Sequence, residues 1–441
     1  MHIKSLALVA AAVMTAGAAQ AADLNKPAKV AVDYVKVCDA YGAGFFYIPG
    51  SDTCLKISGF ARLDMATGGQ SKSTVFGNTG WNTSNNSSNS VRASNAMITK
   101  VRGDVTFDAR TNTSYGLLKS FIEAHTNLNS SATNSTQTFV ELDNAYVQLG
   151  GLTAGRTTSK FNFGDAEQAN QEYQFELFPD YSVNLLAYTF SFGNGITATL
   201  SIEDPTTAGY QTTTASTNNS AVRKNSTTFT YGALNVPDVV AQVNVTQAWG
   251  EAQIAAMYHQ VYGSTSAMGT KSGVAVFGGV LFNIPQLGAG DTIGIQGGYA
   301  LGDAGPMYAA VPTNGELFSD ASISVSGTKL SSEWTVGGVF NHNFSSNLAG
   351  HFSVGYVGWS NTIATSSTTS GKANVGVTEA SAQLDWQPVK NFHVMPDVEV
   401  RSSNLNGVAK ANGAATGGGN NGLPWNNGTS YVFGVRIQRN F

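Results

Sequence analysis

Hydrophobic and polar residues alternate along much of the chain with a period of two, which predicts β-strands rather than helices. Residues 100–110, KVRGDVTFDAR, are the clearest case. Every second side chain from Lys100 onward is charged or a threonine, and the side chains between them are Val, Gly, Phe or Ala. Because successive side chains of a strand point to opposite faces, this strand has one face with five charges and one without any.

Alternating segments of about ten residues recur from residue 55 to the end of the chain. The pattern predicts sixteen of them, an even number that brings both ends of the wall to the same side. We expect them to begin near residues 55, 96, 115, 139, 152, 185, 196, 238, 251, 273, 292, 333, 348, 378, 391 and 431.

Short and long connections follow one another between these segments. The short ones lie at residues 111–115, 150–151, 193–195 and 345–347. Tight turns on one rim and long polar loops on the other are typical of outer-membrane barrels, whereas a soluble sandwich has no reason for that asymmetry. The long connections are residues 68–95, 128–136, 205–227, 301–332, 361–376 and 404–430.

The charged strand face determines the fold class that we predict. Backbone groups in hydrocarbon must all be paired, so a β structure in a membrane closes into a barrel. A basic group on the lipid face near the midplane would cost about 2 to 4 kcal/mol, so the charges must face a wet lumen. The prediction is an all-β, 16-stranded antiparallel transmembrane β-barrel, a size that leaves an aqueous channel.

Composition and the first residues agree with export. Charged residues make up 12% of the chain, about half of what soluble domains carry. Residues 1–21 have Lys4 ahead of an apolar run and the sequence Ala19-Gln20-Ala21, which predicts a cleaved signal peptide. A membrane-anchoring helix is the alternative, but the run is too short for it. The net charge of −4 argues against a nucleic-acid partner.

Cys38 and Cys54 are the only cysteines. In an exported protein an isolated pair most often forms one disulfide, which we expect here. A redox pair or a metal site is the alternative, but there is neither a CxxC spacing nor a nearby histidine. We therefore expect residues 22–54 to form a periplasmic-side segment ahead of the barrel, residues 55–441.

Both ends of the chain resemble one family. The stretch VCDAYGAGFFYIPGSDTCLKISGFARLD and the terminal YVFGVRIQRNF, which ends in Phe441, resemble the alphaproteobacterial general porins of rhizobia and their relatives. The resemblance covers about residues 37–441, and the long loops carry no motif. It implies an outer-membrane homotrimer among phospholipid and lipopolysaccharide, each barrel a passive diffusion pore for small hydrophilic solutes and ions, without a cofactor. Phe441 would be the signal for the barrel-assembly machinery.

The resemblance also implies a constriction. Residues 157–184 follow the fifth segment, LTAGR, where porins have a third external loop that folds inward. A solvated loop lying outside is the alternative, although the aromatic residues of this loop favour a place against the barrel wall. Its carboxylates would face basic side chains on the wall and so set a transverse field. The loop carboxylates are Asp165, Glu167, Glu172, Glu176 and Asp180, and the basic set is Arg62, Lys100, Arg102, Arg110 and Arg156, with Arg436 as a further candidate.

Four further acidic side chains lie in the predicted strands. Asp104 and Asp108 lie on the same strand face as Arg102 and Arg110, and salt bridges that stiffen the wall are an alternative to a role in the pore. Glu141 and Asp143 do not fit the alternation of their segment.

Three other functions compete with a general pore. An enzymatic barrel would need a Ser with a His and an orienting acid. The histidines are scattered singly and there is no G-x-S-x-G or HExxH motif, so we predict neither catalysis nor a metal site. A substrate-specific channel and a surface adhesin remain as alternatives. The excess of acidic residues predicts a preference for cations.

Overall fold

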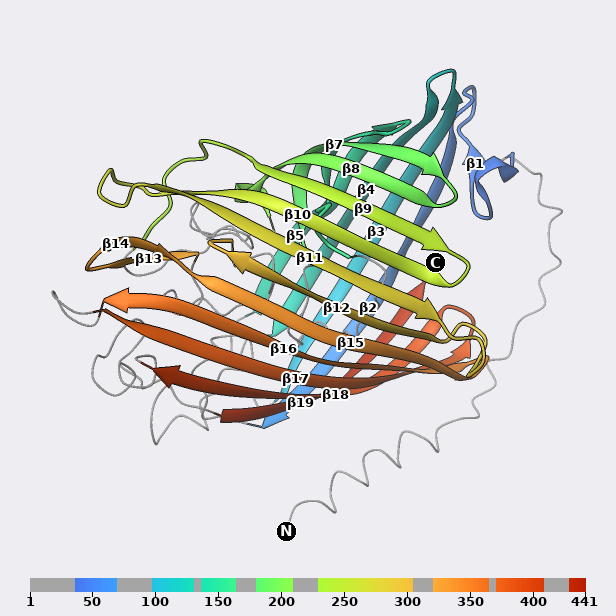
Figure 1. The fold of residues 1–441 in the computed structure, drawn as a ribbon. Coiled ribbons are helices and arrows are strands. Elements are labelled where there is room, and N and C mark those ends of the chain that lie inside the picture. The colour runs from blue at the N-terminus through green and yellow to red at the C-terminus, as the bar shows by residue number, and fades with distance from the viewer. Residues whose placement is uncertain are drawn as a thin grey trace, which may run out of the picture.

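The computed structural model describes residues 36–69, 97–130, 136–163, 180–208, 229–303, 320–364, 370–407 and 428–441. Most of these residues lie in strands, and sixteen strands close into one antiparallel barrel, with β19 paired to β2 (Figure 1). The barrel strands are β2 (Cys54–Gly69), β3 (Met97–Thr113), β4 (Gly116–Ser130), β5 (Thr136–Leu149), β6 (Leu152–Thr158), β7 (Ser182–Gly193), β8 (Ile196–Asp204), β9 (Asp238–Gln247), β10 (Gly250–Tyr262), β11 (Thr270–Asn283), β12 (Thr292–Leu301), β15 (Ser332–Ser345), β16 (Leu348–Ala364), β17 (Ser370–Val389), β18 (Phe392–Gly407) and β19 (Gly428–Asn440).

The structure confirms the predicted fold class and strand count. Fifteen strands begin within three residues of the predicted position, and β17 begins at Ser370 rather than near residue 378. Closure removes both sheet edges, since Leu63 of β2 is the register partner of Ile437 of β19. Every strand in the wall therefore has a neighbour on both sides, as hydrocarbon surroundings require.

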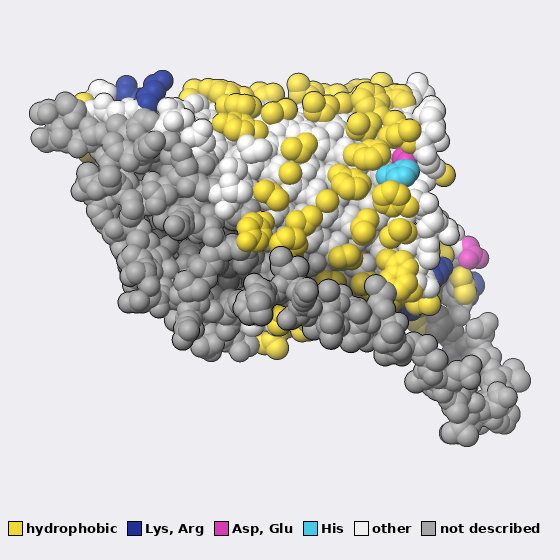
Figure 2. Space-filling view, turned by 90° about the horizontal axis from the view of Figure 1, so that it is seen from below, with side chains coloured by type: hydrophobic (Ala, Val, Ile, Leu, Met, Phe, Trp, Pro, Cys, Tyr) yellow, Lys and Arg dark blue, Asp and Glu magenta, His cyan; other side chains and the backbone are white. Residues whose placement is uncertain are grey.

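The two faces of the wall follow the predicted parity. On β3, Val101, Val105 and Phe107 are 48%, 39% and 42% exposed on the outside, whereas Lys100 and Asp104 are buried on the inside. Figure 2 shows hydrophobic side chains over the outer wall, with Lys, Arg, Asp and Glu only toward its two ends. No helix in the described part of the chain has the length and hydrophobicity to cross a membrane.

Short turns gather at one end of the barrel, which we call the short-turn end, and the strand ends that the long connections join lie at the other, the long-loop end (Figure 1). At the short-turn end, Gly193, Asn194 and Gly195 all have positive φ, at 82°, 50° and 72°. This backbone suits Gly and Asn, which tolerate the left-handed region. At the long-loop end, a hairpin of β13 (Ala321–Ser324) and β14 (Gly327–Leu330) contacts β16, and the 3-10 turn η2 (Pro205–Thr207) follows β8.

Residues 36–53 fold against the short-turn end of the barrel. Cys38 and Cys54 form the predicted disulfide. It joins the 3-10 turn η1 (Asp39–Tyr41) and the short strand β1 (Phe46–Tyr47) to β2, with which β1 pairs. Cys38, Phe45 and Cys54 form a small buried cluster. The predicted signal peptide lies outside the described residues.

A bulge in β5 accounts for the acidic residues that break the alternation. Glu123 of β4 pairs with Asn144, but the next residue, Ala124, pairs with Leu142, so Asp143 is an extra residue in the ladder. A bulge of this kind shifts parity by one. On β5 the outward side chains are accordingly Val140 and Leu142 before it and Val147 after it.

Candidate functional site

Four basic side chains meet on the inner face of β2, β3 and β19, and we call them the basic cluster: Arg62, Lys100, Arg102 and Arg436. Two adjacent register rows bring them together, because Arg62 pairs with Arg102, and Asp64 pairs with both Lys100 and Arg436. Asp64 lies between two guanidiniums. Arg436 Nε donates to its Oδ1 at 2.6 Å, and Arg62 Nε lies 3.2 Å from its Oδ2.

The next rows toward the short-turn end carry carboxylates, the acidic belt of Asp104, Glu123, Glu141 and Asp143. His125 connects two of them, since it hydrogen-bonds to Glu141 and its Nδ1 lies 4.0 Å from Asp104 Oδ2. Glu123 accepts from Asn144 at 2.8 Å. The inner wall of β2 to β5 therefore changes sign along the barrel axis, from basic to acidic.

Arg110 lies far from the basic cluster. It pairs with Cys54, eight residues along β3 from Arg102, which corresponds to roughly 27 Å of strand. Its guanidinium donates to both carboxylate oxygens of Asp108, at 2.9 and 2.6 Å, and lies 5.0 Å from the Phe45 ring. This is one of the salt bridges that we expected as an alternative to a role in the pore, and it joins two residues at the short-turn end.

Arg156 also lies away from the basic cluster. On β6 the buried side chains are Thr153 and Thr157, so Arg156 has the outward parity. Its Nε donates to the Leu142 carbonyl at 2.8 Å and its Nη1 to the Thr207 carbonyl at 2.7 Å. Arg156 matches the basic residue of the family in sequence, but it does not occupy the position that we expected from this match.

Residues 159–163, which follow β6, hydrogen-bond to the inner face of the barrel wall. Ser159 Oγ donates to Glu203 Oε2 at 2.6 Å, and the Lys160 amide donates to Glu203 Oε1 at 3.0 Å. Further across, Gln253 of β10 donates to the Asn162 carbonyl at 2.8 Å. Because Glu203 and Gln253 both lie on the inner face, these bonds hold residues 159–163 against the inside of β8 to β10.

Two phenylalanines of this segment bury themselves in an apolar patch on the inner wall. Phe161 is 0% exposed and Phe163 5%. The Phe161 ring lies 5.9 Å from that of Phe277 on β11. We call the wall residues of this cluster the inner apolar patch: Val240, Ala255, Met257, Ala275, Phe277, Leu281, Ala300 and Val339.

Only one of the five predicted loop carboxylates belongs to the described residues. Asp180 precedes β7, and desolvation by the surrounding protein together with the charge of Asp143 raises the pKa of Asp180 above its usual range. It thus lies near the acidic belt. Asp165, Glu167, Glu172 and Glu176 lie outside the described residues.

Our reading of the sequence missed Glu203, Gln253 and the inner apolar patch. A signal for the patch exists, because residues 273–282 of β11, GVAVFGGVLF, have no polar side chain on either parity. An inner face without polar groups cannot line water well and has to be covered by other parts of the protein. No group of His, Cys, Asp and Glu side chains among the described residues is arranged to hold a metal ion.

The last residue of the chain pairs with Gly59 of β2 through its backbone. The Phe441 amide donates to the Gly59 carbonyl at 3.0 Å, and the Gly59 amide donates to the Phe441 carbonyl at 3.3 Å. The Phe441 side chain is 62% exposed. The terminal residue is thus fixed by its backbone while its ring remains accessible.

Comparison with known proteins agrees with this architecture. The model of the porin subfamily matches residues 23–420. The chain is 36% identical to porin Omp2b of Brucella suis over 220 residues, covering 46% of this chain and 52% of that protein. It is 36% identical to porin Omp2b of Brucella abortus over 217 residues, covering 46% and 54%. The chain thus spans about half the length of the curated relatives it matches.

Among solved structures, the outer membrane channel DcaP of Acinetobacter baumannii is similar to this chain with a TM-score of 0.63 and 14% identity. The match covers 90% of this chain and 99% of DcaP. At this identity the likeness shows the fold. With the family match and the closed barrel, the chain belongs to the porin subfamily and lies in the bacterial outer membrane.

Proposed function

We propose that the barrel is a water-filled pore through which small hydrophilic solutes and ions diffuse passively. One observation carries the proposal: a closed wall of sixteen strands has charged side chains on its inner face and apolar ones on its outer face. A barrel of this size is too wide for its side chains to fill. Charged groups on the inner wall are stable only if water or opposite charges surround them.

We further propose that residues 157–184 narrow the channel. The bonds of Ser159 and Asn162 to the inner wall, and the burial of Phe161, support an inward course for the start of this loop. Its carboxylates Asp165, Glu167, Glu172, Glu176 and Asp180 would face the basic cluster. Arg110 and Arg156 are not part of the proposed constriction, because one lies at the short-turn end and the other has outward parity.

The proposed selectivity is a weak preference for cations, set by loop carboxylates and the acidic belt against the basic cluster. Facing charges of opposite sign are a usual basis of pore selectivity. In this proposal the short-turn end faces the periplasm, as in other outer-membrane barrels. A homotrimer, contacts with lipopolysaccharide and recognition of Phe441 by the assembly machinery rest on the family resemblance alone. The proposal includes no catalytic activity.

Planar-bilayer recording tests the pore. The folded full-length chain should give steady ohmic steps in KCl, grouped in threes if the trimer forms. A surface adhesin would give little current, and a substrate-specific channel would be blocked by micromolar sugar or anion. In a KCl gradient the reversal potential should favour potassium. Replacing Asp165 by Asn and Glu167 by Gln should reduce that preference, and an unchanged potential would remove both residues from the constriction.

A further inference from the structure

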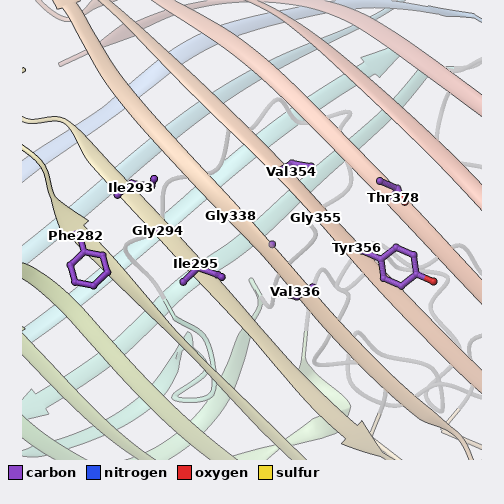
Figure 3. A pocket seen from close by; sticks show the side chains of 11 residues that line it. Phe282, Ile293, Gly294, Ile295, Val336, Gly338, Val354, Gly355, Tyr356 and Thr378 are labelled. Atoms are coloured by element: carbon purple, nitrogen blue, oxygen red, sulfur yellow. The ribbon is translucent and has the colours of Figure 1, made fainter. Parts of the chain in front are cut away.

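The outer face of the barrel carries a groove that a diffusion pore does not use. It lies over β11 to β16, encloses about 710 Å³ and is lined almost entirely by apolar side chains and glycines. Ile293 and Ile295 stand on one side of it, Val354 and Tyr356 on the other, and Gly338 lies between them (Figure 3). The volume falls within the roughly 300 to 1,000 Å³ typical of sites that bind small ligands.

A single glycine explains the groove. Gly338 of β15 pairs with Ile295 of β12 and with Val354 of β16, and all three have outward parity. Ile295 is 56% exposed and Val354 54%, so their side chains stand above the wall while Gly338 leaves bare backbone between them. Because this face meets hydrocarbon, a furrow between two ridges of branched side chains fits an alkyl chain.

A polar site lies on the same strand, closer to the short-turn end. His342 also has outward parity, four residues or roughly 13 Å along β15 from Gly338. Its ring stacks on Phe340 at 6.0 Å and meets the edge of Phe344 at 4.6 Å. The His342 side chain is 27% exposed, and its Nε2 makes no hydrogen bond to any described residue.

Asp291 fixes the direction of this ring. Its Oδ2 lies 2.5 Å from His342 Nδ1, and its Oδ1 accepts from the Asn343 amide at 2.9 Å. The Asn343 backbone amide, followed by the hydrogen bond from His342, lowers the pKa of Asp291 below its usual value, so this carboxylate stays charged. With Nδ1 held by Asp291, Nε2 points away from the turn. When the ring carries both protons, Nε2–H donates to an anion outside the wall.

We propose that His342 and the groove together bind one phospholipid, with its phosphate at His342 Nε2 and one acyl chain over Gly338. The spacing supports this occupant, because a polar site and an apolar furrow follow each other along the strand direction as a headgroup and its chain do. The aromatic rings beside His342 match the girdle that outer-membrane barrels place at the interface. A phosphate alone would not need the groove, and an alkane alone would not need His342.

Native mass spectrometry of the folded full-length chain in detergent, with dioleoyl phosphatidylglycerol added, tests the proposal. His342→Gln removes the donor, and Ile295→Trp fills the groove. Each should lower the fraction of chains that retain lipid about tenfold, as expected for the loss of one charge-assisted hydrogen bond or of a well-packed chain. Far-UV circular dichroism confirms that every variant is folded.

The chain offers matched controls for both changes. Ile122→Trp alters an outward isoleucine of β4 that is 47% exposed, several strands along the wall from the groove. His393→Gln alters a histidine whose Nδ1 lies 3.0 Å from the Asp385 carboxylate but which has inward parity. Both controls should retain lipid as the unchanged chain does, and an equal loss in the controls would overturn the proposal.

One further outcome tests whether the ring and the groove act together. If only His342→Gln loses lipid, the ring binds phosphate without help from the groove, and the proposed site is wrong. Lipid retention is measured without current, so it can fail or succeed independently of the proposed pore.

Discussion

Two parts of one barrel wall have opposite inner faces. On β19 and β2 to β5 the inner face carries the basic cluster and, next to it along the barrel axis, the acidic belt. On β9 to β12 and β15 the inner face carries the inner apolar patch, and Phe161 and Phe163 cover it. The outer faces of the two parts are alike, since Val105 of β3 and Ile254 of β10 are both exposed apolar side chains.

The difference shows how a single wall serves a pore and a fixed loop. Charged rows are stable where water remains, so β2 to β5 form the wet side of the lumen. Apolar rows are stable only where protein covers them, and burying a phenylalanine there contributes about 1.5 to 3 kcal/mol. Residues 159–163 are thus held on the apolar side of the inner wall.

The largest effect should come from removing a side chain that packs on the inner apolar patch. Phe161→Ala removes a ring that is 0% exposed, and large-to-small changes of this kind cost about 3 to 5 kcal/mol. Guanidinium unfolding in detergent micelles should show this loss. The control Tyr115→Ala removes a ring in the turn between β3 and β4 that is 82% exposed. Equal losses in the two variants would mean that residues 159–163 add nothing to the stability of the barrel.

A pair of lysine substitutions on β3 tests the wet side. Val105→Lys places a charge on the lipid face near the middle of the strand, where it should cost about 2 to 4 kcal/mol. Thr106→Lys places the same charge on the inner face beside Asp104, whose carboxylate lies 3.5 Å from the Thr106 hydroxyl, and should cost much less. Unfolding in lipid vesicles measures both. A larger loss for Thr106→Lys would contradict the assignment of the two faces.

The sequence predicted the wall well for a physical reason. A strand that separates water from hydrocarbon must alternate, and its turns must be polar or glycine-rich, so both are visible without the structure. The positions of Arg110 and Arg156 in the barrel were harder to predict from the sequence. Parity gives the face but not the height, and Arg110 shares its face with Arg102 at a distance of roughly 27 Å.

Where parity fails, a local irregularity or a covered surface is the cause. Asp143 breaks the predicted alternation because one extra residue in β5 shifts the parity. A bulge of this kind leaves no clear mark in a single sequence. Glu203 and Gln253 resemble any other inward polar residues until their partners Ser159 and Asn162 are known. Long-range hydrogen bonds of this kind depend on the course of the loop, which local patterns do not encode.

A smaller effect should come from one polar anchor of the covered side. Ser159→Ala removes the hydroxyl that donates to Glu203 Oε2, and Glu203 is 2% exposed. A buried acceptor that loses its donor costs about 1 to 3 kcal/mol. Ser272→Ala is the control, because its hydroxyl makes only a 3.4 Å exposed contact with Tyr258. Unfolding midpoints in guanidinium should fall for the first variant and stay unchanged for the second.

The smallest effect should be on ion selectivity. It tests whether the height of a charge along the barrel matters as well as the strand face on which the charge lies. Arg102→Gln removes one charge from the basic cluster, which the proposed constriction faces. The ratio of potassium to chloride permeability should then rise by about twofold, which corresponds to ~0.4 kcal/mol. Reversal potentials in a KCl gradient measure it.

Arg110→Gln removes the same charge from the same face of the same strand, but from a guanidinium that is bound to both oxygens of Asp108 at the short-turn end. At a Debye length of about 10 Å in 0.1 M salt, that charge is screened from a constriction near Arg102. The reversal potential should therefore stay where it is in the unchanged chain. An equal shift for both variants would mean that the narrow part of the pore extends along the whole charged wall, because only then would the height of a charge not matter.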